Sequence, residues 1–197
     1  NYTINVVPGT LTVTRKVVTL KSANLSKSYD GNALTNGEEN LETEEGWVTG
    51  EGATYTFTGS QTEVGESPNS FTYTLNDGTK AENYEISTVA GTLKVTSYTE
   101  AITVTITEHS GEAKYDGQIH NVTGYDVTIN DSLYAESDFS FSGDATISGT
   151  NAGIYEMNLT EADFTNTNSN FENVTFVIVP GKLEIAKRSV TLTSASD

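Results

Sequence analysis

The chain has 197 residues and no cysteine, and its 27 acidic residues against 10 basic residues give a net charge of −17. This charge excludes binding to the nucleic-acid backbone, because two polyanions repel each other. The lack of cysteine excludes a small domain stapled by disulfides, and no apolar run is long enough for insertion into a membrane.

Alternation of apolar and polar residues predicts β-strands along the chain. In chain order, the clearest alternating segments are residues 11–14, 55–58, 71–75 and 102–107. A period of two places the large side chains on one face and the threonine hydroxyls on the other. Because one face then meets a core and the other meets water, the pattern favours antiparallel over parallel sheets.

Turn signals separate these strands. Asp-Gly or Asn-Gly pairs occur at residues 30–31, 36–37, 77–78 and 116–117. Such pairs accept positive φ angles and predict tight hairpins. Helical pattern is limited to three short turns, at residues 38–45, 132–136 and 161–164.

The chain repeats itself, and one period separates Tyr29 from Tyr115 in two Tyr-Asp-Gly motifs. Val18 and Val190, each followed by Thr-Leu, are separated by twice that period. A repeat of this length is large enough to fold as a domain with its own core. We predict a closing strand of a preceding repeat at residues 1–14, a first domain at 15–97, a second at 98–186, and an opening strand of a following repeat at 187–197.

The repeated motifs have simple structural interpretations. In Tyr-Asp-Gly we expect the tyrosine ring to enter the core, the aspartate to accept backbone hydrogen bonds, and the glycine to form the turn. Gly9, Gly91 and Gly181 each precede an alternating segment, and we expect a tight turn there.

The best candidates for ligand binding are an aromatic residue with acidic neighbours and a second tyrosine. Trp47 follows Glu44 and Glu45 closely, and Tyr134 lies in the polar segment 131–138. Aromatic rings beside carboxylates can bind sugars or cations. The alternative is that Trp47 anchors the base of a loop whose charges are solvated.

Cofactor and catalytic chemistry have little support. Residues 76–78 and 166–173 offer oxygen atoms without a full calcium-loop spacing, so we predict no cofactor, with calcium as the alternative. His109, Ser110 and Asp116 resemble a triad on paper, but both histidines, His109 and His120, lie in the second repeat. We therefore predict that the protein is not an enzyme.

Two lysines suggest another chemistry. A buried, neutral lysine amine can attack an asparagine side chain when an acid assists. Lys27 and Lys114 lie beside the two Tyr-Asp-Gly motifs, but at different distances from the tyrosine. The mismatch weighs against a crosslink that both repeats share.

Several sequence segments resemble a known repeat: residues 27–31, 152–159, 170–176 and 180–185. The chain is similar to the MBG/YDG-type tandem domains of bacterial cell-surface adhesin-like proteins. This resemblance implies secreted or wall-attached proteins in which copies form stalks, and it supplies no catalytic residues.

We therefore predict an all-β protein of two tandem Ig-like β-sandwich domains with about seven strands each. The alternative is a mostly-β, grasp-like domain with a short helix. The predicted function is a structural stalk or spacer, and the alternative is adhesion to a host glycan or protein through loops. We expect a monomeric, extracellular chain whose partners are neighbouring repeats, with no nucleic acid and no membrane insertion.

Overall fold

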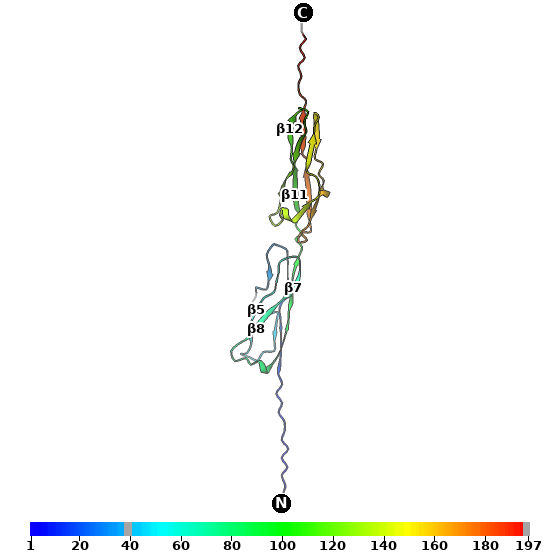
Figure 1. Ribbon diagram of the computed structural model, residues 1–197. Helices are drawn as coiled ribbons and strands as arrows, with labels where there is room; N and C mark the ends of the chain where they lie inside the picture. The colour runs from blue at the N-terminus through cyan, green and yellow to red at the C-terminus, as the bar shows by residue number, and fades with distance from the viewer. Residues whose placement is uncertain (38–40, 195–197) are drawn as a thin grey trace. The chain divides into compact units, whose positions relative to one another are not determined.

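The computed structural model describes residues 1–37 and 41–194 (Figure 1). The chain divides into two compact units, Asn1–Thr96 (unit 1) and Ser97–Asp197 (unit 2). This division lies one residue from the boundary that the repeat predicts. Across the described residues the helical segments are three short 3₁₀ turns, so the chain is all-β, as predicted, and the grasp-like alternative with a helix is not observed.

The strands of unit 1 are short. They are β1 (Lys16–Lys21), β2 (Leu25–Ser28), β3 (Leu34–Thr35), β4 (Thr43–Glu45), β5 (Ala53–Phe57), β6 (Ser60–Gln61), β7 (Gly65–Asn69), β8 (Phe71–Leu75), β9 (Tyr84–Val89) and β10 (Gly91–Thr96), with one 3₁₀ turn, η1 (Ala81–Asn83).

Unit 2 contains a matching set. Its strands are β11 (Ile102–Glu108), β12 (Gly111–Lys114), β13 (His120–Thr123), β14 (Tyr125–Ile129), β15 (Phe139–Phe141), β16 (Thr146–Gly149), β17 (Gly153–Glu156), β18 (Phe164–Asn166), β19 (Val174–Val179) and β20 (Lys182–Ala186), with turns η2 (Glu136–Asp138) and η3 (Glu161–Asp163).

The two units share one strand-pairing plan. In unit 1 the strand orders are β4-β1-β9, β2-β10-β7, β3-β6 and β5-β8, and in unit 2 they are β14-β11-β19, β12-β20-β17, β13-β16 and β15-β18. Each unit has more described strands than the predicted seven. Part of the excess arises because the first strand divides into β1 and β2 (β11 and β12), and the last into β9 and β10 (β19 and β20).

Most strand pairs are antiparallel, as the alternation predicted, but the first and last strands of each unit are not. β1 pairs in parallel with β9, and β2 with β10. β11 and β12 pair in the same way with β19 and β20. Alternation reports that one face of a strand is buried, but it carries no information on the direction of the neighbouring strand.

The prediction of tight hairpins was wrong. Within residues 1–37 and 41–194, no two strands that are consecutive in the chain pair with each other. Gly31, Gly78 and Gly117 do have positive φ angles, of 78°, 89° and 80°. These glycines make turns, but the strand that follows each turn does not pair with the strand that precedes it.

The short predicted turns had mixed outcomes. η3 lies within the predicted segment 161–164, whereas η2 shares only Glu136 with the predicted segment 132–136 and continues beyond it. Residues 38–40 of the predicted turn at 38–45 lie outside the described residues, and residues 43–45 form β4 instead. Pairing of β4 with β1 explains this difference, and the Lys21 ammonium lies 2.7 Å from the Glu42 carboxylate beside it.

The cores are built mainly from the first and last strands. The most deeply buried apolar side chains, all 2% exposed or less, are Val18, Leu20, Leu93 and Val95 in unit 1, and Ile102, Val104, Ile106, Ile147, Leu183 and Ile185 in unit 2. A polar residue continues each leading row at the next core-facing position, Ser22 after Leu20 and Glu108 after Ile106.

The predicted partial repeats at the two ends have a different environment. Residues 1–15 form no strand, and their apolar side chains are exposed, with Tyr2 100% and Leu11 91% accessible. Residues 187–194 also form no strand. Completion of neighbouring repeats by these segments stays a prediction. Within the part of the chain that the structure describes, no helix is long and apolar enough to cross a lipid bilayer.

Candidate functional site: the paired first and last strands

The most distinctive feature of unit 1 is a long parallel pairing between its first and last strands. Lys16 lies opposite Tyr84, and Leu25 lies opposite Leu93, so the same offset along the chain holds across both halves. Backbone bonds extend the ladder, from Ser22 N to Val89 O at 3.1 Å and from Tyr29 N to Thr96 O at 2.8 Å. The two chain segments therefore stay in register from residue 16 to residue 29.

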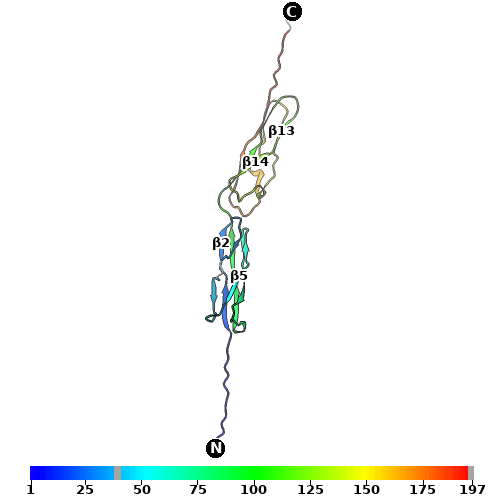
Figure 2. The same ribbon diagram turned by 90° about the vertical axis from the view of Figure 1, so that its left-hand side faces the viewer.

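Unit 2 repeats this arrangement with a slightly longer insert. Ile102 lies opposite Val174, and Gly111 lies opposite Leu183, so the offset is again constant from one half to the other. The Tyr115 N–H donates to Ala186 O at 2.9 Å, as Tyr29 does in unit 1. Because the paired strands run in the same direction, the chain joins each unit at one end and leaves it at the other (Figures 1 and 2).

Side chains close the gap where the ladder of unit 1 changes sheets. Between β1 and β2, the buried Ser22 hydroxyl accepts the Gly91 N–H at 2.8 Å and donates to Asn69 O at 2.6 Å. The Asn69 amide in turn donates to Ala23 O at 2.9 Å. Thr92 N donates to the side chain of Asn24 at 2.9 Å. We call this group the unit 1 joint.

A carboxylate takes this position in unit 2. The buried Glu108 side chain accepts the Gly181 N–H at 2.7 Å with one oxygen, and the Leu159 N–H at 2.9 Å with the other. Lys182 N donates to the Ser110 hydroxyl at 3.1 Å. This group is the unit 2 joint. Gly181 corresponds to Gly91, so both joints satisfy the same backbone N–H with a different side chain.

The glycine at each joint is required by close approach, which corrects the expected tight turn. A β-carbon on Gly91 would lie 2.3 Å from Ala23 O, and one on Gly181 would lie 2.3 Å from His109 O. Neither residue has a positive φ angle, and a single residue separates the end of β9 from Gly91, the first residue of β10. Gly9, in the exposed leading segment, has no atom within 4 Å of that position.

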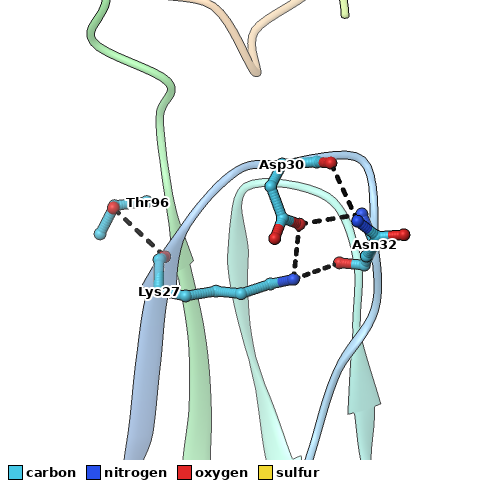
Figure 3. Close-up of polar contacts among 4 residues, drawn as sticks. All are labelled: Lys27, Asp30, Asn32 and Thr96. Atoms are coloured by element: carbon cyan, nitrogen blue, oxygen red, sulfur yellow. Dashed lines mark hydrogen bonds and ion pairs between the residues drawn. The ribbon is translucent and has the colours of Figure 1, made fainter.

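The Tyr-Asp-Gly motif of unit 1 closes the end of the paired strands (Figure 3). Asp30 Oδ1 accepts the Asn32 N–H at 2.9 Å and lies 2.6 Å from the Lys27 ammonium. These contacts, the lysine first, hold the pKa of the Asp30 carboxyl below its usual value. The ammonium also donates to the backbone carbonyl of Asn32 at 2.6 Å. Lys27 therefore makes an ion pair within one turn, and it meets the backbone of Asn32 instead of the amide side chain that a crosslink would need.

The second motif keeps the turn but changes the cation. Asp116 Oδ1 accepts the Gln118 N–H at 2.9 Å and lies 3.0 Å from His120 Nε2. These contacts, the backbone bond first, lower the pKa of Asp116. Lys114 is exposed on β12. The expected burial of the tyrosine ring was wrong, because Tyr115 is 40% exposed and Tyr29 is only half-buried.

Three of the predicted ligand-binding residues lie together in unit 1. The half-buried Trp47 ring packs edge-on against Tyr84 with 4.9 Å between ring centroids. Glu44, exposed on β4, accepts a 2.6 Å hydrogen bond from the Tyr55 hydroxyl, and Glu45 is exposed next to it. Burial and then the Glu44 carboxylate raise the pKa of Tyr55. Trp47 packs against the core cluster of Val18, Leu20 and Tyr84, as the loop-anchor alternative expects.

The fourth predicted residue lies in the core of the other unit. Tyr134 is 3% exposed, and its hydroxyl lies 3.1 Å from Asp138 O and 3.0 Å from Asn166 Oδ1. Burial, followed by the Asp138 carboxylate, raises its pKa to about 12. Phe171 packs edge-on against its ring at 5.0 Å. Tyr134 thus connects η2 with the end of β18 and with the segment that follows β18.

The side chains of His109, Ser110 and Asp116 do not come together as a catalytic triad. His109 lies 3.2 Å from Asp126, whereas Asp116 contacts His120, and the Ser110 hydroxyl accepts a backbone bond in the joint. In residues 1–37 and 41–194, no group of three or more His, Asp or Glu side chains is placed to hold a metal ion. Sequence reasoning missed Ser22 and Glu108, although each is a polar residue that ends an apolar row at a core-facing position.

Comparison with known families gives one match, which lies in unit 2. The family model described as MBG domain matches residues 101–187, from the residue before β11 to the residue after β20. No curated protein and no solved structure matches the chain. Residues 101–187, somewhat less than half of the chain, are therefore similar to the MBG domain.

Proposed function

We propose that the two units are stalk or spacer repeats of a cell-surface protein, displayed outside the cell, without catalytic activity. The carrying observation is the parallel pairing of the first and last strands in each unit. A repeat built in this way spans its own length between the point where the chain joins it and the point where the chain leaves it. Copies in tandem then add length with each repeat.

The length that one repeat supplies follows from strand geometry. Residues 16–28 run alongside residues 84–96, and at about 3.3 Å per residue the run is about 40 Å long. The matching strand orders of the two units support the same role for unit 1 as for unit 2, which is similar to the MBG domain. The net charge of −17 disfavours collapse of neighbouring repeats onto one another.

Small-angle scattering on chains with two, four and six units tests the spacer role. We expect the maximum dimension to rise by a constant increment of roughly 40 Å per unit. Growth with the cube root of the mass would indicate collapsed globules and contradict the proposal.

Adhesion is the second proposal. The exposed carboxylates of Glu44 and Glu45 near Trp47 make this surface a better candidate for the contact than the other surfaces. In this case the partner is a host glycan or protein. A glycan array probed with the chain and with its Trp47→Ala and Glu45→Gln variants tests this role. Binding that both variants reduce supports adhesion, whereas a blank array with the unmodified chain leaves the spacer role alone.

A further inference from the structure

The parallel strand pair sets how each unit responds to tension. The first strand begins where the chain joins the unit, and the last strand ends where it leaves. Tension between these two points pulls parallel neighbours in opposite directions along their own axes. The hydrogen bonds between the strands lie across the pulling direction, so the load is shared among them. In a pair pulled apart from one end, the bonds break one after another.

We propose that each unit is a mechanical clamp that resists tension along the chain by shear of its first and last strands. The proposal rests on the stalk function only for the source of the tension. In unit 2 the clamp consists of six residue pairs between β11 and β19 and four between β12 and β20. Unit 1 has the corresponding pairs between β1 and β9 and between β2 and β10.

The joints strengthen the clamp at its weakest point. The ladder is interrupted where the strands change sheets, at residues 109–110 and 180–181. Here Glu108 holds the Gly181 N–H across the strand pair, and Ser110 holds the Lys182 N–H. Glu108 also accepts the N–H of Leu159, which lies three residues after β17, the antiparallel partner of β20. The two halves are thereby coupled, and the first half cannot slide without breaking buried hydrogen bonds in the joint.

The core opposes the same movement. Ile102, Val104 and Ile106 on the first strand, and Leu183 and Ile185 on the last, are at most 2% exposed. Sliding one strand past the other moves these side chains out of their packed positions before any other part of the unit opens. The two clamp strands that carry these side chains also have antiparallel neighbours: β14 lies beside β11, and β17 lies beside β20.

Single-molecule pulling in two directions tests the clamp. The chain has no cysteine, so two introduced cysteines define where the handles attach. Glu100→Cys with Arg188→Cys loads the clamp of unit 2 in shear, because the positions lie two residues outside β11 and β20. Glu100→Cys with Glu172→Cys pulls the same pair apart from one end, since Glu172 lies two residues before β19. All three native side chains are exposed.

We expect an unfolding force at least about threefold higher in shear than in the end-opening geometry, since many bonds share the load only in shear. Equal melting temperatures of the two variants provide the control that their stability is the same. Ser110→Ala, which removes one exposed joint contact, lowers the shear force and leaves the end-opening force unchanged. Equal forces in the two directions would overturn the clamp, and they would leave the scattering test of the spacer role unaffected.

Discussion

The joints of the two units solve one structural problem with different chemistry. In unit 1 the hydroxyl of Ser22 and the amide of Asn69 bridge the strands, whereas in unit 2 the carboxylate of Glu108 does so, with the Ser110 hydroxyl beside it. The backbone around them is the same, including a glycine that touches the opposite strand. The pairing plan is therefore fixed by the backbone and its glycine, and several side chains can satisfy the buried N–H that the plan creates.

Substitution of the two joint glycines, Gly91 and Gly181, is expected to have the largest effect on stability. Gly91→Ala and Gly181→Ala each place a β-carbon 2.3 Å from a carbonyl oxygen of the facing strand, and backbone must move to relieve the contact. We expect each substitution to destabilise its own unit by about 3 kcal/mol. Denaturant unfolding measures this, and Trp47 fluorescence reports unit 1 because it is the only tryptophan.

Gly9→Ala is the matched control for these variants. Gly9, like Gly91 and Gly181, precedes an alternating segment, but no atom lies within 4 Å of its β-carbon position. We expect no measurable change in stability. A loss as large as that of Gly91→Ala would show that the loss of stability comes from a general requirement for glycine before these segments and not from the close contact at the joint.

Removal of the bridging side chains has a smaller effect that separates the units. Glu108→Ala leaves the N–H groups of Gly181 and Leu159 without their acceptor, so we expect a loss of about 2–3 kcal/mol in unit 2. Ser22→Ala removes the acceptor of one N–H, that of Gly91, and the donor to Asn69 O, and we expect a loss of about 1–2 kcal/mol in unit 1, because a hydroxyl is a weaker acceptor than a carboxylate. Urea unfolding of the two variants measures both, and a larger loss from Ser22→Ala would contradict the comparison.

The pattern of residues predicted some of these features and not others. Alternation in residues 102–107 predicted both the strand and its buried face, because a one-sided core imposes a period of two. The Asp-Gly pairs predicted turns but not partners, because a positive φ angle is a local property and strand pairing is not. The parallel clamp joins residues as distant in the chain as Lys16 and Tyr84, and no local pattern encodes that choice. Ser22 and Glu108 could have been found, since each is a polar residue in phase with a core row.

The response to pH should distinguish the units further. His109 lies in unit 2, and the Asp126 carboxylate and the Thr123 carbonyl raise its pKa. A raised pKa in the folded state means that the contribution to stability is present below the unfolded pKa and is lost as pH rises through the folded value. We therefore expect unit 2 to lose stability from mildly acidic to mildly alkaline pH. Proton NMR of the two histidines, both in unit 2, measures the pKa directly.

His109→Gln is the control for this titration. The variant should make the stability of unit 2 less dependent on pH in that range, while the Trp47 signal from unit 1 stays unchanged. An unaltered pH dependence would assign the effect to another group.

The Lys27 ion pair provides the smallest effect. Lys27→Met removes the main cause of the lowered Asp30 pKa and leaves the Asn32 N–H in place. We expect the Asp30 pKa to rise toward its usual value without reaching it, as measured by carbon NMR of the carboxyl group. Since a lowered pKa contributes stability above the unfolded value that is lost as pH falls, the variant should lose less stability in acid. An unchanged pKa would mean that the turn alone sets it.

The spacer and clamp proposals both depend on first and last strands that run in parallel and in one continuous register. Nuclear Overhauser contacts between backbone protons of the isotope-labelled chain test this pairing. We expect contacts that link Val104 with Phe176 and Ala113 with Ile185, two pairs with the same separation along the chain. Contacts whose separation changes steadily along the strands would show antiparallel pairing and contradict both the spacer geometry and the clamp.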